Sequence, residues 1–289
     1  MNTLAALAAM ASGEPASAEL VDRYYTLCIP FYREFLGDHW HTGFYPEQGP
    51  IGPADQLRME LLVARSAGIA SGSRVLDVGC GVGGTACHLA RALGAQVHGL
   101  TPNTEQRGLA LARSRELGLQ ERVRFDTGWS HALPYEAGSF DAVLFFESAC
   151  HFTDRAAFFA EAFRVLRPGG CLAGEDWLAG EGAEPVLRWT WCARVEEAWA
   201  IPALGTVGQY AALMRAAGFE LELALDMREE MPLLRGFLSD REARAAVAEE
   251  ARQTAEPMRR QIMEALVVLG KAAQIGAFTV GRFVARKPG

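Results

Sequence analysis

The sequence predicts an α/β fold with a doubly wound, mostly parallel, seven-stranded sheet. A short apolar strand, Arg74–Val78, ends in a cluster of glycines. Strand and helix patterns then alternate, as they do in parallel sheets whose crossover connections are helices. The composition is 50% hydrophobic and 22% charged, which suits a large buried core and excludes a disordered chain.

The first part of the chain follows this alternation closely. In residues 18–35 apolar and aromatic side chains recur every three to four positions, which is the period of one helix face. Residues 38–53 contain many Gly and Pro residues and predict a loop. Further helices are expected at 57–67, 103–117 and 154–166, strands at 95–100, 122–126, Phe140–Phe146 and 171–177, and a turn at 167–170.

The alternation loosens after residue 177. The remaining expected elements are helices at 184–199 and 206–217, a strand at 219–225, a long Ala-, Glu- and Arg-rich stretch at 240–268, and an alternating, edge-like strand at 278–287. We expect one sheet domain with helical additions. These are an N-terminal lid at 1–56 and a domain at 57–289 that carries inserted caps at about 178–217 and 230–270.

Charge and cysteine usage narrow the class of protein. With 28 basic and 35 acidic residues the net charge is −7, so the chain lacks the basic surface that nucleic acid or an anionic membrane requires. No apolar run is long enough to span a bilayer, and the first basic residue is Arg23, too late for a signal peptide. Six scattered cysteines match neither a zinc nor a disulfide pattern. These features predict a cytoplasmic protein.

The string VLDVGCGVGG at 75–84 is the most informative motif. It places Gly79, Gly81 and Gly83 where a buried strand turns into a helix. At such a junction glycines permit a sharp turn, and backbone amides can approach a ligand closely. A glycine pattern alone is a weak signal, because dinucleotide-binding enzymes use a similar one.

The string resembles motif I of the class I S-adenosylmethionine-dependent methyltransferases, which have a Rossmann-like fold and an acidic residue at the position of Asp77. The resemblance continues in order over 74–177, through GLTPNTEQ, LPYEAGSFDAV and RVLRPGG. It implies S-adenosylmethionine as the cofactor. A nicotinamide enzyme would carry an acidic residue about 20 positions beyond the loop, where this chain has Gly99-Leu100-Thr101.

The string GLTPNTEQ at 99–106 resembles the corresponding motif of one branch of that family, which includes sterol, tocopherol and antibiotic-sugar methyltransferases. There Thr101 and Gln106 would hold the ribose hydroxyls. Trp129 replaces an aspartate that often binds adenine, so stacking and backbone contacts near Ser130 would hold the base; core packing is the alternative for Trp129. The expected cofactor residues are Asp77, Gly79, Cys80, Gly81, Gly83, Thr101, Gln106, Trp129, Ser130 and Glu147.

The sequence ESACHF, which begins at Glu147, resembles the E-S-x-x-H motif of the same branch. The resemblance implies that His151 is a general base and that Asp176, at the end of the fifth strand, is its partner. A carboxylate orients such a ring and supports its charged form. The alternatives are a loop-binding role for His151 and a strand-end cap for Asp176. Glu147 would bind an acceptor hydroxyl or amine, or stabilise and deprotonate a carbocation.

Residues 23–45 resemble the N-terminal lid of this branch. The lid positions are Tyr24, Tyr25, His41, Gly43 and Tyr45, and for the first two helix packing is an equal alternative. His39 and His41, two apart, could both face a metal in an extended segment. The pair is too short a signal, and no metal is predicted.

Aromatic residues of the cap suit an apolar or aromatic acceptor; they are Trp177, Trp189, Trp191, Trp199 and Phe237. The sequence thus predicts a methyltransferase of specialised or antibiotic biosynthesis that acts on oxygen, nitrogen or carbon of a small molecule, and it is compatible with a homodimer. Three alternatives stay open: an isoprenoid diphosphate C-methyltransferase, a cyclase that keeps the cofactor without methyl transfer, and a nicotinamide oxidoreductase.

Overall fold

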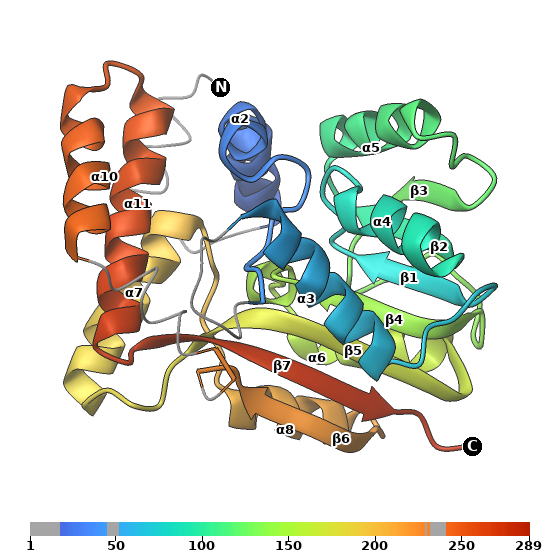
Figure 1. Ribbon diagram of the computed structural model, residues 1–289. Coiled ribbons are helices and arrows are strands. Elements are labelled where there is room, and N and C mark those ends of the chain that lie inside the picture. The colour runs from blue at the N-terminus through green and yellow to red at the C-terminus, as the bar shows by residue number, and fades with distance from the viewer. Residues whose placement is uncertain (1–17, 45–51, 229, 232–240) are drawn as a thin grey trace.

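A computed structural model (Figure 1) describes residues 18–44, 52–228, 230–231 and 241–289. A seven-stranded sheet in the order β3-β2-β1-β4-β5-β7-β6 runs through its centre. The strands are β1 (Arg74–Val78), β2 (Gln96–Thr101), β3 (Val123–Thr127), β4 (Phe140–Phe146), β5 (Leu166–Ala179), β6 (Glu220–Asp226) and β7 (Phe278–Arg286). Parallel pairs join β3, β2, β1, β4 and β5 in this order. β7 pairs antiparallel with β5 and with the edge strand β6. The predicted fold class is therefore confirmed.

Helices cover both faces of the sheet. They are α2 (Ala18–Leu36), α3 (Pro53–Ser66), α4 (Gly84–Leu93), α5 (Thr104–Glu116), the 3-10 turn η1 (Ala149–His151), α6 (Arg155–Val165), α7 (Pro185–Trp199), α8 (Val207–Ala216), α10 (Arg241–Gln253) and α11 (Pro257–Gln274). One core joins α3, α4 and α11 to the sheet, and the other joins α6 and α8 to its opposite face. Among the described residues, no helix is both long and apolar enough to cross a bilayer.

The two faces follow from side-chain alternation along β5. Ala173 belongs to the core under α3 and α4, whereas Leu172 belongs to the core under α6 and α8. Successive strand residues point to opposite faces, so Glu175 and Asp176, further along β5, also point to opposite sides of the sheet. This separation decides which of the two carboxyls can meet the lid.

The parallel strands bring their carboxyl ends to one edge of the sheet. β1 lies between β2 and β4, and these three strands end at Val78, Thr101 and Phe146. Ligands of open parallel sheets bind beyond this edge. Helix α2 lies over the same edge and contacts both α5 and α11 (Figure 1). The glycine loop, Thr101 and Glu147 are therefore neighbours beneath α2.

The C-terminal strand differs from its prediction as an edge strand. β7 lies between β5 and β6, antiparallel to both, and is buried from Phe278 to Ala285. The prediction was wrong because the polar members of the alternating pattern are satisfied internally. Arg282 pairs with Glu230 at 3.0 Å, and the Thr279 hydroxyl donates to a carboxylate of β6 at 2.5 Å.

The predicted turn at 167–170 forms a bulge inside β5 rather than a separate loop. Leu166 pairs with Phe140, and Cys171 pairs with Ala142, so the residues between them bulge out of register. Gly169 has φ +71°, a conformation that glycine adopts without steric cost. β5 therefore begins at Leu166, earlier than predicted, and the predicted turn with its left-handed glycine lies inside the strand.

Candidate active site

A cavity of about 1060 Å³, its opening to solvent included, lies at the carboxyl edge of the sheet. The sequence-predicted residues that line it are Tyr25, His41, Asp77, Gly79, Cys80, Gly81, Thr101, Gln106, Trp129, Ser130, Glu147 and His151. Among the described residues, Gly83, Tyr24, Asp176 and Trp177 lie outside this lining. Tyr45 lies outside the described residues.

Packing and backbone conformation both require glycine at two positions of the loop. A Cβ on Gly79, where φ is +85°, would lie 2.4 Å from the Cβ of Ser148. A Cβ on Gly83, where φ is +80°, would lie 2.6 Å from the ring of Phe125. Any side chain at either position would collide with its neighbour as well as strain the backbone. Gly83 therefore serves the packing of α4 on the sheet, and its contact with the cofactor stays a prediction.

Asp77, the penultimate residue of β1, is a buried carboxyl on the cavity wall. Its Oδ2 atom has no hydrogen-bond partner among the described residues. Burial, reinforced by the charge of Glu60, raises the pKa of Asp77 to about 7. A buried, unpartnered polar atom is costly unless a ligand satisfies it, so this position is suited to a ligand with hydrogen-bond donors.

At the end of β2 a hydrogen-bonded set joins the cavity to the lid helix. Thr101 Oγ1 donates to Gln106 Oε1 at 2.7 Å, which leaves the Gln106 amide nitrogen as a donor. Asn103 caps α5 by accepting from the Gln106 backbone N–H at 2.8 Å. Its own amide donates to Asp22 at 2.8 Å and to Thr26 at 2.7 Å, both on α2. These contacts of Asn103 were not predicted.

Trp129 is 38% exposed and lines the cavity, so its alternative role as a core residue is wrong. Its ring stacks on His131 with 6.3 Å between centroids and 21° between planes. Ser130, next to it, also lines the cavity. An exposed ring at the cavity mouth is available to stack on a planar ligand.

His151 is paired with a tyrosine of the lid. Its Nε2 lies 2.8 Å from the hydroxyl of Tyr25, and its Nδ1 lies 3.4 Å from the carbonyl of Ala200. Burial lowers the pKa of His151 to about 4, so the ring is neutral at pH 7. If Nδ1 carries the proton toward Ala200, Nε2 accepts the Tyr25 O–H. Ala200 itself has φ +52°, an uncommon left-handed conformation for a residue with a side chain.

Asp176, the partner predicted for His151, is engaged elsewhere. It accepts hydrogen bonds from the Tyr210 hydroxyl at 2.8 Å and from the Trp177 backbone N–H at 2.9 Å. Burial raises its pKa to about 7. The reason for the separation is strand alternation, which turns Asp176 toward α8 while Tyr25 reaches His151 from α2. A catalytic role for Asp176 stays a prediction, but its predicted pairing with His151 is replaced by Tyr25.

Glu147 lies at the cavity in a strained backbone conformation. Its φ is +43°, a value rare for a non-glycine residue and frequent at functional sites. The turn is held by Ser148, whose hydroxyl donates to the Val78 carbonyl at 2.7 Å. Burial raises the pKa of Glu147, against the opposing effect of a 2.8 Å hydrogen bond from the Thr42 backbone N–H. The lid loop thus contacts a cavity carboxyl directly.

Glu175 is a buried carboxyl that the sequence reasoning missed. Neither of its oxygens has a hydrogen-bond partner among the described residues, and its closest ionic contact is His41 Nδ1 at 3.8 Å. Burial, with the added repulsion of Glu147, raises the pKa of Glu175 well above its usual range. The signal that could have found it is the same alternation along β5, which aims Glu175 at the lid.

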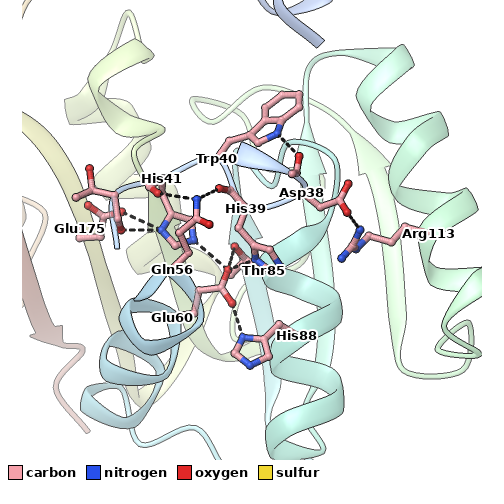
Figure 2. Close-up of polar contacts among 12 residues, drawn as sticks. Asp38, His39, Trp40, His41, Gln56, Glu60, Thr85, His88, Arg113 and Glu175 are labelled. Atoms are coloured by element: carbon pink, nitrogen blue, oxygen red, sulfur yellow. Dashed lines mark hydrogen bonds and ion pairs between the residues drawn. The ribbon is translucent and has the colours of Figure 1, made fainter. Parts of the chain in front are cut away.

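A cluster of which the sequence indicated only the pair His39 and His41 surrounds Glu60 on α3 (Figure 2). His39, His41, Thr85 and His88 all direct a nitrogen or hydroxyl at its carboxylate. Burial alone would raise the pKa of Glu60, but these contacts hold it well below its usual range. The rest of the cluster has no local sequence signal, because its members come from α3 and α4 as well as from the lid loop.

The cap aromatics that the structure describes do not line the cavity. Trp199 is buried, Trp177 and Trp191 pack partly buried against the core, and Trp189 is 75% exposed. Phe237 lies outside the described residues. Apolar cavity walls come instead from the lid, β4 and the turn after it, and the residues are Tyr25, Trp40, Phe146 and Phe152.

Comparison with known proteins fits this geometry. Residues 76–174 match a family model described as a methyltransferase domain. Methyltransferase GfsG of Streptomyces halstedii is 35% identical over 215 residues, which cover 73% of this chain and 76% of that protein. A sterol 24-C-methyltransferase of Pneumocystis carinii is 31% identical over 212 residues, covering 71% of this chain and 54% of that protein. The chain thus spans about half the length of the sterol enzyme.

Solved structures share the fold of this chain. The [4+2]-cyclase SpnF matches with a TM-score of 0.79 and 27% identity, covering 95% of this chain and 97% of that one. Geranyl diphosphate methyltransferase, in complex with GPP and sinefungin, matches in fold with a TM-score of 0.73 at 20% identity, covering 93% and 98%. The chain belongs to the class I S-adenosylmethionine-dependent methyltransferase family.

Proposed function

We propose that this chain transfers the methyl group of S-adenosylmethionine to a small-molecule acceptor in specialised biosynthesis. The observation that carries the proposal is that one cavity is lined both by the glycine loop with Asp77 and by the Tyr25–His151 pair. The division into a lid at 1–56 and a catalytic domain at 57–289, with caps at 178–217 and 230–270, is part of this proposal. The similarity to the methyltransferase GfsG supports it.

The residues of the cavity fit S-adenosylmethionine. The unpartnered Oδ2 of Asp77 suits a donor of the cofactor, the amide nitrogen of Gln106 beside Thr101 suits the ribose hydroxyls, and the exposed Trp129 suits the adenine ring. When bound, S-adenosylmethionine supplies an electrophilic methyl group on a sulfonium. The task left to the chain is to align the acceptor, exclude water and accept a proton.

Tyr25 and His151 can accept that proton from a hydroxyl or amine acceptor. A hydroxyl oxygen that gains a methyl group becomes strongly acidic, so for a hydroxyl acceptor even a base with a pKa of about 4 is sufficient. The acceptor proton would pass to the Tyr25 oxygen while the Tyr25 proton passes to His151 Nε2, 2.8 Å away. The neutral ring has a lone pair available for this transfer at pH 7.

The cavity walls support an apolar or aromatic acceptor. Tyr25, Trp40, Phe146 and Phe152 line it, and the net charge of −7 argues against nucleic acid. Glu147 lies on the same wall, where it suits an acceptor hydroxyl or amine, or a carbocation if the acceptor is an isoprenoid diphosphate. The similarity to geranyl diphosphate methyltransferase is one of fold alone.

Cyclisation without methyl transfer is the second candidate function. The match to the [4+2]-cyclase SpnF extends over 95% of this chain, lid and cap included. In such an enzyme the glycine loop would serve to bind the cofactor as a structural element, and the aromatic walls would align the substrate. Cofactor binding is common to both functions, so only the fate of the methyl group separates them.

The test follows that methyl group. The protein is incubated with methyl-labelled S-adenosylmethionine and a metabolite extract of the source cell, and both labelled products and S-adenosylhomocysteine are measured. Methyl transfer predicts that the two appear together and that both form about a hundredfold more slowly in His151→Ala. Conversion of an extract component without S-adenosylhomocysteine would favour the cyclase, and no change in any component would contradict both functions.

A further inference from the structure

Glu60 is the centre of a buried cluster behind the cavity wall (Figure 2). Its Oε1 atom lies 2.6 Å from His39 Nδ1, 3.0 Å from His41 Nε2 and 2.8 Å from Thr85 Oγ1. Its other oxygen, Oε2, contacts His88 Nδ1. Three imidazoles and a carboxylate from three separate segments therefore meet around one point.

Hydrogen bonding alone accounts poorly for the crowding on Oε1. A carboxylate oxygen offers about two lone pairs, yet three polar atoms lie within 3.0 Å of this one. A cation between the nitrogens and the oxygen would relieve this conflict, because each atom would then direct a lone pair at the same centre.

The ring of His41 gives the second argument. Its Nδ1 lies 3.0 Å from the carbonyl oxygen of Thr42, which only accepts, so this nitrogen carries a proton. In a neutral ring Nε2 is then a bare lone pair, and it faces another lone pair on Glu60 at 3.0 Å. Either a second proton or a metal ion must lie between them. The same arrangement, one nitrogen toward the ion and the other N–H on a backbone carbonyl, is usual for metal-bound histidine.

We propose that His39 Nδ1, His41 Nε2 and Glu60 bind a divalent transition-metal ion of the zinc type. The ligand atoms of these three residues lie within 4.8 Å of one another, close enough to share one ion. Two imidazoles with one carboxylate favour zinc or a similar ion over magnesium or calcium, which prefer all-oxygen sites. The inference does not depend on the proposed methyl transfer.

The surroundings provide the outer contacts that such a site requires. His88 holds the second oxygen of Glu60, and Thr42 holds the second nitrogen of His41. Gln56, on α3, donates its amide to the backbone carbonyls of His39 and His41. Outer contacts of this kind fix the ligands in place and raise metal affinity.

The ion would anchor the lid loop. His39 and His41 belong to the loop after α2, Glu60 to α3, and Thr85 with His88 to α4, the helix that begins at the glycine loop. Thr85 and His41 also line the cavity. One ion would thus join the lid to the cofactor-binding side of the fold without itself entering the acceptor region.

The experiment measures metal binding directly in the whole protein. The purified protein is treated with a chelator, and Zn²⁺ is titrated against a chromophoric competitor; Co²⁺ is then added and its visible absorption recorded. We expect one equivalent to bind and the Co²⁺ bands to show nitrogen and oxygen ligation. Glu60→Gln and His41→Gln should each weaken Zn²⁺ binding at least a hundredfold, and His88→Gln about tenfold, since it loses only an outer contact.

His131→Gln is the matched control, because His131 is an exposed histidine outside the cluster and should leave Zn²⁺ binding unchanged. The wild-type Co²⁺ spectrum keeps the test decisive even if a cluster variant fails to fold. Absence of a stoichiometric Zn²⁺ site in the wild type would overturn the proposal. So would a nitrogen-15 NMR spectrum that shows both ring nitrogens of His41 protonated in the presence of Zn²⁺, because a proton would then occupy the position of the ion.

Discussion

Two buried glutamates lie on either side of His41 and have opposite electrostatic character. Glu60 and Glu175 are both fully buried. The pKa of Glu60 is held well below its usual range by three histidines, whereas burial raises that of Glu175 well above it, since no hydrogen bond opposes the burial. Burial is therefore the same for both, and the number of donors decides whether the carboxyl is charged.

The two glutamates belong to two different regions. Glu60 anchors the lid loop to α3 and α4, whereas Glu175 lies on the side of His41 where the cavity contains Glu147. Negative charge is concentrated at Glu60, where the lid loop, α3 and α4 meet. On the other side of His41, burial raises the pKa values of both Glu147 and Glu175. The pair His151–Tyr25 lies on the cavity side, with Glu147.

The largest effect is expected from the anchor. Glu60→Ala leaves three imidazoles without their shared acceptor and should lower the free energy of unfolding by about 3–5 kcal/mol, the cost of breaking a buried ionic group. Chemical denaturation at pH 7 measures it. Glu249→Ala, at an exposed ion pair with Arg252, is the control. Equal stabilities for the two variants would contradict the anchor role.

The next effect concerns the reaction rather than stability. His151→Ala should lower kcat by about a hundredfold while cofactor affinity changes little. Because the pKa of His151 is about 4, the base form is fully present above pH 6, and wild-type kcat/KM should fall only as the pH drops toward 4. A decline of kcat/KM centred near pH 6.5 would show that the buried ring is not the titrating base.

Tyr25→Phe removes only the hydroxyl that His151 accepts from, and should lower kcat about tenfold. Asp176→Asn is the matched comparison, because that carboxyl bonds Tyr210 rather than His151. Its effect on kcat should be smaller than that of Tyr25→Phe at equal cofactor affinity. The reverse order of the two variants would restore Asp176 as the partner of His151.

The smallest effect is expected at Glu175. The raised pKa favours the protonated carboxyl, so Glu175→Gln should change the free energy of unfolding at pH 5 by less than about 1 kcal/mol. A raised folded pKa contributes stability below the unfolded value near 4.3 that is lost as the pH rises. The variant should therefore gain stability relative to wild type as the pH rises above about 5. A variant that loses stability over this range would mean that Glu175 is charged.

The sequence predicts most of the fold because its signals are local. Strand β4 is found at its predicted bounds, and helix α2 differs by one residue, since apolar periodicity and turn residues lie within each segment. The position of β7 inside the sheet is not local. It depends on partners such as Glu230 and Asp226, which satisfy the polar residues of β7 from other segments.

The candidate site likewise combines residues that local motifs predict with contacts between distant segments that they do not predict. The glycine loop and Thr101 belong to contiguous motifs and line the cavity as expected. The pairing of His151 with Tyr25 joins residues 126 positions apart, and the cluster of Glu60 joins three segments. No short motif encodes such meetings, although alternation along β5 could have indicated that Asp176 faces away from the lid.

Direct binding of the cofactor tests the central claim most simply. Calorimetric titration of the protein with S-adenosylmethionine should show one site, weakened about tenfold or more in Asp77→Asn, with NADH giving no heat in a parallel titration. Retention of full affinity in Gly108→Ala, at an open position outside the cavity, is the expected control. Wild-type protein that binds NADH and not S-adenosylmethionine would contradict the account.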